Sequence, residues 1–159
     1  MFFCFKYNEG RGIICILPVP IDYSSELKKC LCATLDVYEK LDLVAKAKET
    51  GKMLGSELER LKAKHTSVGD VRYIGLFAAV ELVKDKTTKE PLLVPYGKDP
   101  EGIMGKITGK LKSKGFSTFC HENNVLVAPP LIITDGELLD AMKILDEVLD
   151  YVDGMKEMI

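Results

Sequence analysis

The chain has 159 residues, of which 47% are hydrophobic and 29% charged, and its formal net charge is −2 at pH 7. This length favours a single domain with a core that folds without disulfides, and the composition is that of a globular protein. Acidic and basic residues are interspersed, so we expect no basic face for nucleic acid or anionic lipid. The apolar runs at 1–5 and 12–21 resemble neither a signal peptide nor a membrane span, so we expect no membrane partner.

The five cysteines are odd in number, lie in apolar segments and form no CxxC pair. This usage predicts buried thiols in a reducing, cytoplasmic compartment. Cys30 and Cys32 with a histidine were considered as metal ligands, but their one-residue separation is wrong for a zinc knuckle. We therefore predict no metal site.

Residues 1–21 are expected to supply one or two short strands, because Ile13–Leu17 is a compact apolar run that ends at Pro18 and Pro20. A helix is predicted from Ser24 to Val37, with Ser24 or Ser25 as its N-cap. Its expected buried stripe consists of Leu27, Leu31, Thr34 and Leu35.

The segment from Asp42 to Lys64 has the spacing of an amphipathic helix, with Asp42 as its expected N-cap. Lysines and glutamates occupy one face, which is interpreted as a solvated surface. The other face is expected to be buried and consists of Val44, Ala47, Leu54, Leu58 and Leu61.

Val68–Val83 is the longest apolar run with an uncharged middle, and it is predicted to be one central strand covered on both faces in its first half. Gly75 would lie inside this strand, at a bulge or a close backbone approach. Arg72 is the unusual charge, interpreted first as a strand-end arginine paired with Asp70 or a helix acid, and second as a substrate contact.

In the C-terminal half, a polar turn and a loop precede a helix that begins at Asp99–Pro100 and stops at Gly115. Gly102, Gly105 and Gly109 weaken this helix, so they indicate either close packing or mobility.

A hairpin is predicted from Phe116–Cys120 and Val125–Ala128, joined by the polar residues 121–124. The last helix has a Thr134/Glu137 capping box. Its apolar stripe consists of Leu138, Met142, Leu145, Leu149 and Val152.

These elements predict an α/β (α+β) fold, a two-layer sandwich of helices on a small, largely antiparallel sheet. No nucleophile elbow, phosphate loop, dinucleotide fingerprint or metal-binding helix motif is present. His121 beside Glu122 was considered as an acid–base pair, but exposed polar residues are expected in a turn, and this simpler interpretation is favoured.

Three separated motifs carry a family resemblance: TLDVYEKLDLVAKAKETGKMLGSELERLKAKH, then VGDVRYIGLFAAVELVKDKTTKEP, then VLVAPPLIIT before a helix. In this order they resemble the C-terminal domain of class III, pyridoxal-phosphate-dependent aminotransferases of fold type I. The resemblance covers residues 33–152, so we divide the chain into an unassigned segment at 1–30 and an aminotransferase small domain at 31–159.

The resemblance implies a small domain that packs beside a larger cofactor domain, helps to bind the amino donor or acceptor, and completes a homodimer. The family's Schiff-base lysine, the aromatic residue on the pyridine ring and the aspartate at its nitrogen all belong to that large domain. Pyridoxal phosphate is therefore implied for the complete enzyme, and we expect none to be bound by this chain alone.

Arg72 and Gly75 match the family's turn into the strand, and they are expected to be substrate-side or structural positions. Several members have a substrate-carboxylate arginine before the VLVAPP strand. Its nearest counterpart here is Phe119, with His121 two residues later. Catalytic and cofactor-binding residues are expected to be absent.

Two functions remain open. The first is the small domain of a transaminase that moves an amino group between an amine or omega-amino acid and a 2-oxo acid, inactive as an isolated chain. The second is a stand-alone, non-catalytic binding domain that has kept this fold.

Overall fold

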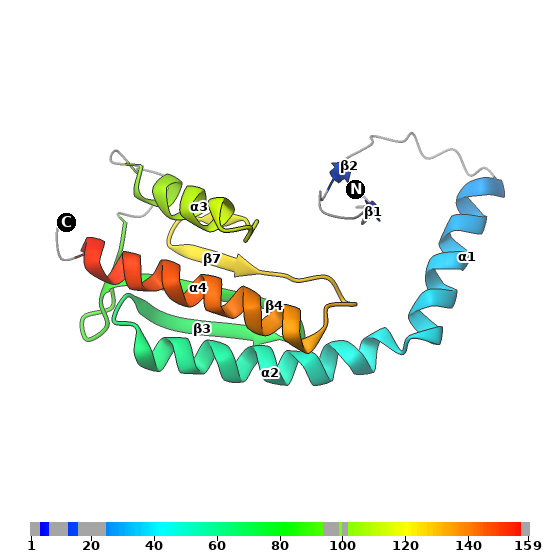
Figure 1. The fold of residues 1–159 in the computed structure, drawn as a ribbon, viewed down its shortest axis with the longest axis horizontal. Coiled ribbons are helices and arrows are strands. Elements are labelled where there is room, and N and C mark those ends of the chain that lie inside the picture. The colour runs from blue at the N-terminus through cyan, green and yellow to red at the C-terminus, as the bar shows by residue number, and fades with distance from the viewer. Residues whose placement is uncertain (1–3, 7–12, 16–24, 94–98, 100–101, 157–159) are drawn as a thin grey trace. The chain divides into compact units, whose positions relative to one another are not determined.

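The structure, a computed structural model, describes residues 4–6, 13–15, 25–93, 99 and 102–156 (Figure 1). The chain divides into two compact units, residues 1–40 and 41–159. In the first unit, β1 (Cys4–Lys6) pairs antiparallel with β2 (Ile13–Cys15), and α1 spans Ser25–Lys40. The short strands and the first helix are thus present, while Pro18, Pro20 and the Ser24 cap lie outside the described residues.

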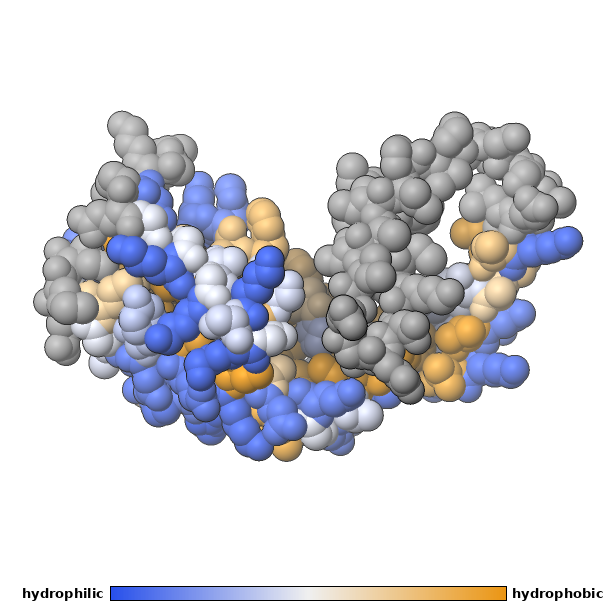
Figure 2. Space-filling model, turned by 45° about the horizontal axis from the view of Figure 1, so that its top comes forward, coloured by the Kyte–Doolittle hydropathy of each residue, from blue (hydrophilic) through white to orange (hydrophobic). Residues whose placement is uncertain are grey.

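The predicted buried stripe of α1 is wrong. Leu31 and Leu35 are 49% and 63% exposed, and Thr34 donates its hydroxyl to the Cys30 carbonyl. Leu27 lies outside the described side chains. Hydrophobic side chains on α1 are visible at the right of Figure 2. The periodicity identified an apolar face, but it carries no information about whether a second element covers that face.

Helix α2 (Leu43–Lys64) begins the second unit and has the predicted bounds to within one residue. Leu54, Leu58 and Leu61 are fully buried, as predicted, whereas Val44 at the first turn is 74% exposed. Asp42 does not cap the helix through its side chain, because it adopts a left-handed conformation with φ 42° in the turn between α1 and α2.

The predicted single strand Val68–Val83 is wrong and is instead a hairpin. Strand β3 (Val68–Ile74) pairs antiparallel with β4 (Phe77–Asp85), and Ile74 faces Phe77 across a two-residue turn. Gly75 therefore lies in the turn and not inside a strand, with a positive φ of 54° that glycine adopts without steric cost.

The hairpin extends into an antiparallel sheet of order β3-β4-β7-β6, and the two-residue strand β5 (Glu90–Pro91) pairs with β4. The predicted second hairpin is shorter than expected: β6 is Cys120–His121, β7 is Asn124–Val127, and only Glu122–Asn123 form the turn. Figure 1 shows α2 and α4 running beside these strands.

Helix α3 (Ile103–Ser113) starts later than predicted, but the Asp99 carboxylate accepts the backbone N–H groups of Ile103 and Met104 at 2.7 and 2.9 Å. Asp99 therefore satisfies the start of the helix as an N-cap does. Gly105 and Gly109 have open space where a Cβ would lie. Close packing does not explain these glycines.

Helix α4 (Asp135–Lys156) confirms its predicted capping box: Thr134 N donates to Glu137 at 2.9 Å, and Glu137 N donates to Thr134 Oγ1 at 3.3 Å. Its predicted apolar stripe is buried in full. Leu54 of α2, Val80 of β4 and Leu145 of α4 belong to one apolar core between the sheet and the helices. The predicted two-layer sandwich of helices on a small antiparallel sheet is confirmed.

No helix among the described residues is long and apolar enough to cross a bilayer. The described cysteines Cys30, Cys32 and Cys120 are free thiols. Cys30 and Cys32 are exposed rather than buried, because they lie on the exposed surface of α1.

Two glycines let α2 approach the β3–β4 hairpin. A Cβ on Gly51 would lie 2.5 Å from the Gly75 carbonyl oxygen, and one on Gly55 would lie 2.3 Å from the Tyr73 ring. Both distances are well below van der Waals contact. A side chain at position 51 therefore requires the helix or the hairpin to move, whereas one at position 55 requires the Tyr73 side chain to move.

Gly51→Ala is expected to lower the free energy of unfolding by about 2 kcal/mol, because overpacking against backbone outweighs the better helix propensity of alanine. Gly109→Ala is the matched control and should raise the free energy of unfolding by up to about 1 kcal/mol, since its Cβ meets open space. Urea unfolding of the three proteins measures both effects. Equal behaviour of the two variants would contradict the close approach.

Candidate functional site

The face of the sheet opposite the helices holds most of the candidate residues, and we call it the open face. Antiparallel partners share a face, so the register places Asp70, Glu81, Asn124 and His121 in one row across the sheet. A second row on this face contains Arg72, Ala79 and Leu126, and Leu126 N donates to the Phe119 carbonyl at 3.0 Å. Arg72, Phe119 and His121, distant in sequence, therefore lie on the same face of the sheet, with strands β4 and β7 between Arg72 and the other two.

Arg72 is an exposed arginine that is paired within the sheet. Its Nη2 lies 2.9 Å from Glu81 Oε2 on β4, and its Nε lies 3.6 Å from Asp70 Oδ2. The pairing with Asp70 was predicted from sequence, while the stronger partner is a strand acid and not a helix acid. Lys62 also donates to Asp70 at 2.9 Å, and this hydrogen bond lowers the pKa of the Asp70 carboxyl.

Phe119 and His121 form an aromatic pair on the open face. Their rings are nearly parallel, with an interplanar angle of 10° and centroids 6.1 Å apart, and Phe119 is 64% exposed. Cys120 between them points to the helix side, where burial raises the pKa of its thiol against a hydrogen bond with Thr108. The alternation of the strand thus presents two rings outward and a partly buried thiol inward.

Gly75 lies in the wall of a cleft with a volume of about 660 Å³ at the tip of the β3–β4 hairpin. The start of α2 and the loop around Pro129 complete its walls, which are mainly apolar. Ile74 and Phe77, exposed by 79% and 55%, border both this cleft and a second hollow of about 500 Å³ that includes Arg72. Gly75 thus lies at the end of the open face, and Ile74 and Phe77 are candidate lining residues that sequence reasoning missed.

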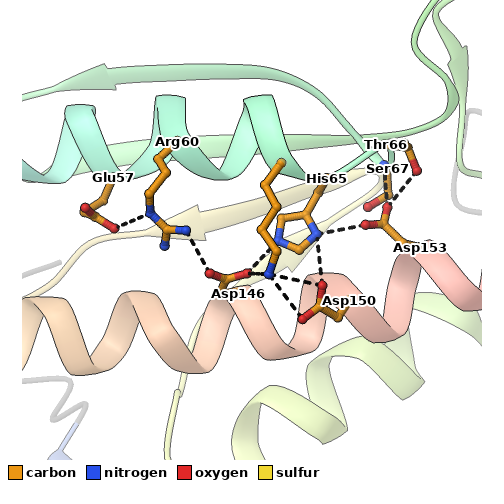
Figure 3. A network of polar contacts seen from close by, with 9 residues as sticks. Glu57, Arg60, His65, Thr66, Ser67, Asp146, Asp150 and Asp153 are labelled. Atoms are coloured by element: carbon orange, nitrogen blue, oxygen red, sulfur yellow. Dashed lines mark hydrogen bonds and ion pairs between the residues drawn. The ribbon is translucent and has the colours of Figure 1, made fainter.

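A polar network on the helix side was also missed from sequence (Figure 3). His65, which is 1% exposed, lies between two aspartates of α4: Nε2 is 2.8 Å from Asp146 Oδ1, and Nδ1 is 2.8 Å from Asp153 Oδ2. Lys64 pairs with Asp146 and Asp150. The signal was present, because aspartates at 146, 150 and 153 have the four- and three-residue spacing of one helix face.

The outer part of this network adds Arg60, which joins Glu57 at 2.9 Å to Asp146 at 3.0 Å. Asp153 accepts the backbone N–H of Ser67 at 2.7 Å and the hydroxyl of Thr66 at 3.1 Å. Within the described part of the chain, the acids near His65 are thus already paired with basic side chains and hydrogen-bond donors. We assign the cluster to the packing of α2 and β3 on α4.

The family of class III aminotransferases matches residues 26–149 of the chain. Taurine–pyruvate aminotransferase from Bilophila wadsworthia is 34% identical over 122 residues, which are 76% of this chain and 26% of that protein. Adenosylmethionine-8-amino-7-oxononanoate aminotransferase from Methanocaldococcus jannaschii is 36% identical over 121 residues, covering 76% of this chain and 25% of that protein.

Among solved structures, taurine:2-oxoglutarate aminotransferase from Bifidobacterium kashiwanohense, in complex with PLP and glutamate, superposes with a TM-score of 0.73 and 41% identity. The match covers 77% of this chain and 27% of that one. The chain therefore belongs to the class III aminotransferase family, as its motifs indicated, and it spans about a quarter of the length of these relatives. The match begins at residue 26, inside the segment 1–30 that we had left unassigned.

The described residues do not by themselves fit pyridoxal phosphate. The cofactor requires an enclosed lysine for its Schiff base and donors for its phosphate. Lys48 and Lys52 border the cleft but are exposed on α2, and the Lys52 ammonium lies 2.9 Å from Glu49. The Arg72 guanidinium is already paired with Glu81.

Arg72→Gln is expected to change the free energy of unfolding by less than about 1 kcal/mol, because ion pairs between exposed side chains contribute little. Lys143→Gln, which removes another exposed pair with Asp140, is the matched control and should behave alike. Urea unfolding measures both. A substantially larger loss for Arg72→Gln would show that this arginine has a structural role on the open face.

Stability at acid pH is expected to depend on Asp146. Burial raises the pKa of its carboxyl, but hydrogen bonds from Lys64, His65 and Arg60 outweigh burial and lower the pKa from 3.8 to about 2. Because the folded state prefers the ionised form, this contribution is present above pH 3.8 and is lost as the pH falls to about 2.

Asp146→Asn should therefore destabilise the protein at pH 5 and above, by about 2 kcal/mol from the pKa difference. The difference from the wild type should shrink progressively between pH 4 and pH 2, and Asp140→Asn on the exposed side of α4 serves as the control. Unfolding at several pH values tests this. A pH-independent difference would show that Asp146 acts through packing alone.

Proposed function

We propose that this chain is the C-terminal, substrate-side part of a class III aminotransferase. In its complete form, the enzyme would transfer an amino group between an amine or omega-amino acid and a 2-oxo acid. The observation that supports this most is the open face, which carries Arg72 on β3 and the aromatic pair Phe119 and His121 at β6, with the cleft at Gly75 at the tip of the β3–β4 hairpin. Its location in a chain that spans 26% of a taurine-using relative suggests one wall of a larger site.

The proposed partner is the remaining, larger part of the aminotransferase fold, which would supply the Schiff-base lysine and hold pyridoxal phosphate. The exposed apolar side chains around the cleft support this, because they suit an interface with another polypeptide surface. Ile74 and Phe77 of the hairpin tip and Val44 of α2 are all more than half exposed. We also propose that the complete enzyme is a homo-oligomer, as the resemblance implies, and that it works in the cytoplasm.

Phe119 and His121 are proposed to face the substrate in place of an arginine. The two rows of the open face contain one permanently charged basic residue, Arg72, and its guanidinium is already paired with Glu81 and Asp70. The described surface therefore offers two rings and no uncommitted cation to a substrate. Gly75 is proposed to act structurally, by allowing the turn that ends this surface.

The isolated chain is expected to have no transaminase activity, because its described lysines near the cleft are exposed and unenclosed. The test incubates the purified chain with pyridoxal phosphate, taurine and pyruvate, and measures alanine formation together with the cofactor absorption spectrum. A cofactor band that an amino donor bleaches, accompanied by alanine, would contradict the proposed inactivity.

The matched positive experiment begins at the gene. Sequencing upstream of the codon for residue 26, where the family match begins, in all three frames should reveal the large domain with its Schiff-base lysine, and the extended protein should form alanine under the same conditions. If no frame encodes these features, the stand-alone binding domain is the better function. That function also predicts a monodisperse protein that binds no hydrophobic dye.

A further inference from the structure

His65 lies outside the proposed substrate surface, at the corner where α2 passes into β3. Its imidazole is 1% exposed, and both ring nitrogens lie 2.8 Å from carboxylate oxygens of α4, Nε2 from Asp146 and Nδ1 from Asp153 (Figure 3). Because each ring nitrogen lies within hydrogen-bond distance of a carboxylate, neither nitrogen is directed at a backbone carbonyl or at solvent.

Both neighbours of the ring are acceptors at neutral pH. The pKa of Asp146 is lowered to about 2, and that of Asp153 is also lowered, because hydrogen bonds from Ser67, His65 and Thr66 outweigh the opposing effect of burial. An ionised carboxylate can only accept hydrogen bonds, and a neutral imidazole has only one N–H. Both 2.8 Å contacts are hydrogen bonds only when both ring nitrogens carry hydrogen.

We propose that His65 is a proton-dependent clasp that joins the α2–β3 corner to α4. When its ring carries two hydrogens, it donates hydrogen bonds to both Asp146 and Asp153, and when it carries one, it donates to only one of them. Loss of one proton leaves a nitrogen lone pair of the buried ring facing a carboxylate oxygen, which is an unfavourable contact between two acceptors. The clasp couples the attachment of α4 to the proton concentration.

Among the described residues, the basic side chains around the ring contact Asp146 and Asp150 rather than Asp153. From α2, Arg60 and Lys64 reach Asp146, and Lys64 also reaches Asp150, whose Oδ1 is 3.7 Å from the His65 ring. From the corner itself, Asp153 receives the Ser67 N–H and the Thr66 hydroxyl. Asp146 thus retains two basic partners when the ring loses a proton, while the remaining donors to Asp153 among the described side chains and backbone groups are neutral.

The sign of the pH effect follows from the geometry. The clasp contributes fully while the ring carries two hydrogens, and its contribution is lost as the pH rises through the range in which one of them leaves. This is opposite in direction to the acid-side effect of Asp146, so the two are separable by pH. The pH range in which the His65 ring loses a hydrogen is measured directly from the NMR signals of that ring.

The first experiment is ¹⁵N–¹H correlation of the histidine rings in the full chain as a function of pH. The chain has two histidines, and His121→Gln assigns the signals while removing only the exposed ring of the open face. The expected result is a His65 ring with both nitrogens protonated at pH 7 and hydrogen-bonded N–H signals on each. A neutral His65 ring at pH 7 in the folded protein would overturn the proposal without any His65 variant.

The second experiment measures the melting temperature of the wild type and of His65→Gln across the same pH range, with His121→Gln as the control. The wild type and His121→Gln should lose several degrees as the His65 ring loses its proton, whereas His65→Gln should show no such loss. If His65→Gln does not fold, Asp153→Asn takes its place, because a neutral partner relieves the unfavourable lone-pair contact. Identical pH profiles of the wild type and the tested variant would overturn the clasp.

Discussion

The close approach of α2 to the backbone of the β3–β4 turn is the constraint on which the geometry of this fold depends. Gly51 lies where any side chain would meet the Gly75 backbone, and Gly55 lies where one would meet the Tyr73 ring. With α2 held at this distance, its leucines reach the core face of the hairpin. The turn and the start of α2 both line the cleft, so the packing of the helix against the turn also determines the shape of this cleft.

The sheet then separates two kinds of chemistry by the alternation of its strands. Val71, Val80 and Val125 point toward the helices and belong to the apolar core. The residues on either side of them, such as Arg72 and Glu81, point to the open face and pair across strands. Because adjacent residues alternate, the same short strands build a core and a candidate substrate surface, and a shift of one residue in register would exchange the two.

The sequence allowed the helices and the fold class to be predicted, since the leucine spacing of α2 and the capping box of α4 are strong local signals. It did not separate β3 from β4, because Ile74, Leu76 and Phe77 continue the apolar run through the turn. A single glycine in an apolar run fits both a bulge and a two-residue turn. The pairing of Ile74 with Phe77 depends on how the strands pack in the folded protein, and the local sequence of such a run does not specify it.

The candidate site shows the same division between local and non-local information. Arg72, Gly75, Phe119 and His121 were proposed from motifs, but their common surface follows from the strand order β3-β4-β7-β6, which pairs distant segments. That order places the aromatic pair three strands from Arg72, with Ala79 of β4 and Leu126 of β7 between them. The row thus has an alanine and a leucine in its middle, an ion pair at the β3 edge and two rings at the β6 edge, and only the pairing of distant strands brings these groups onto one surface.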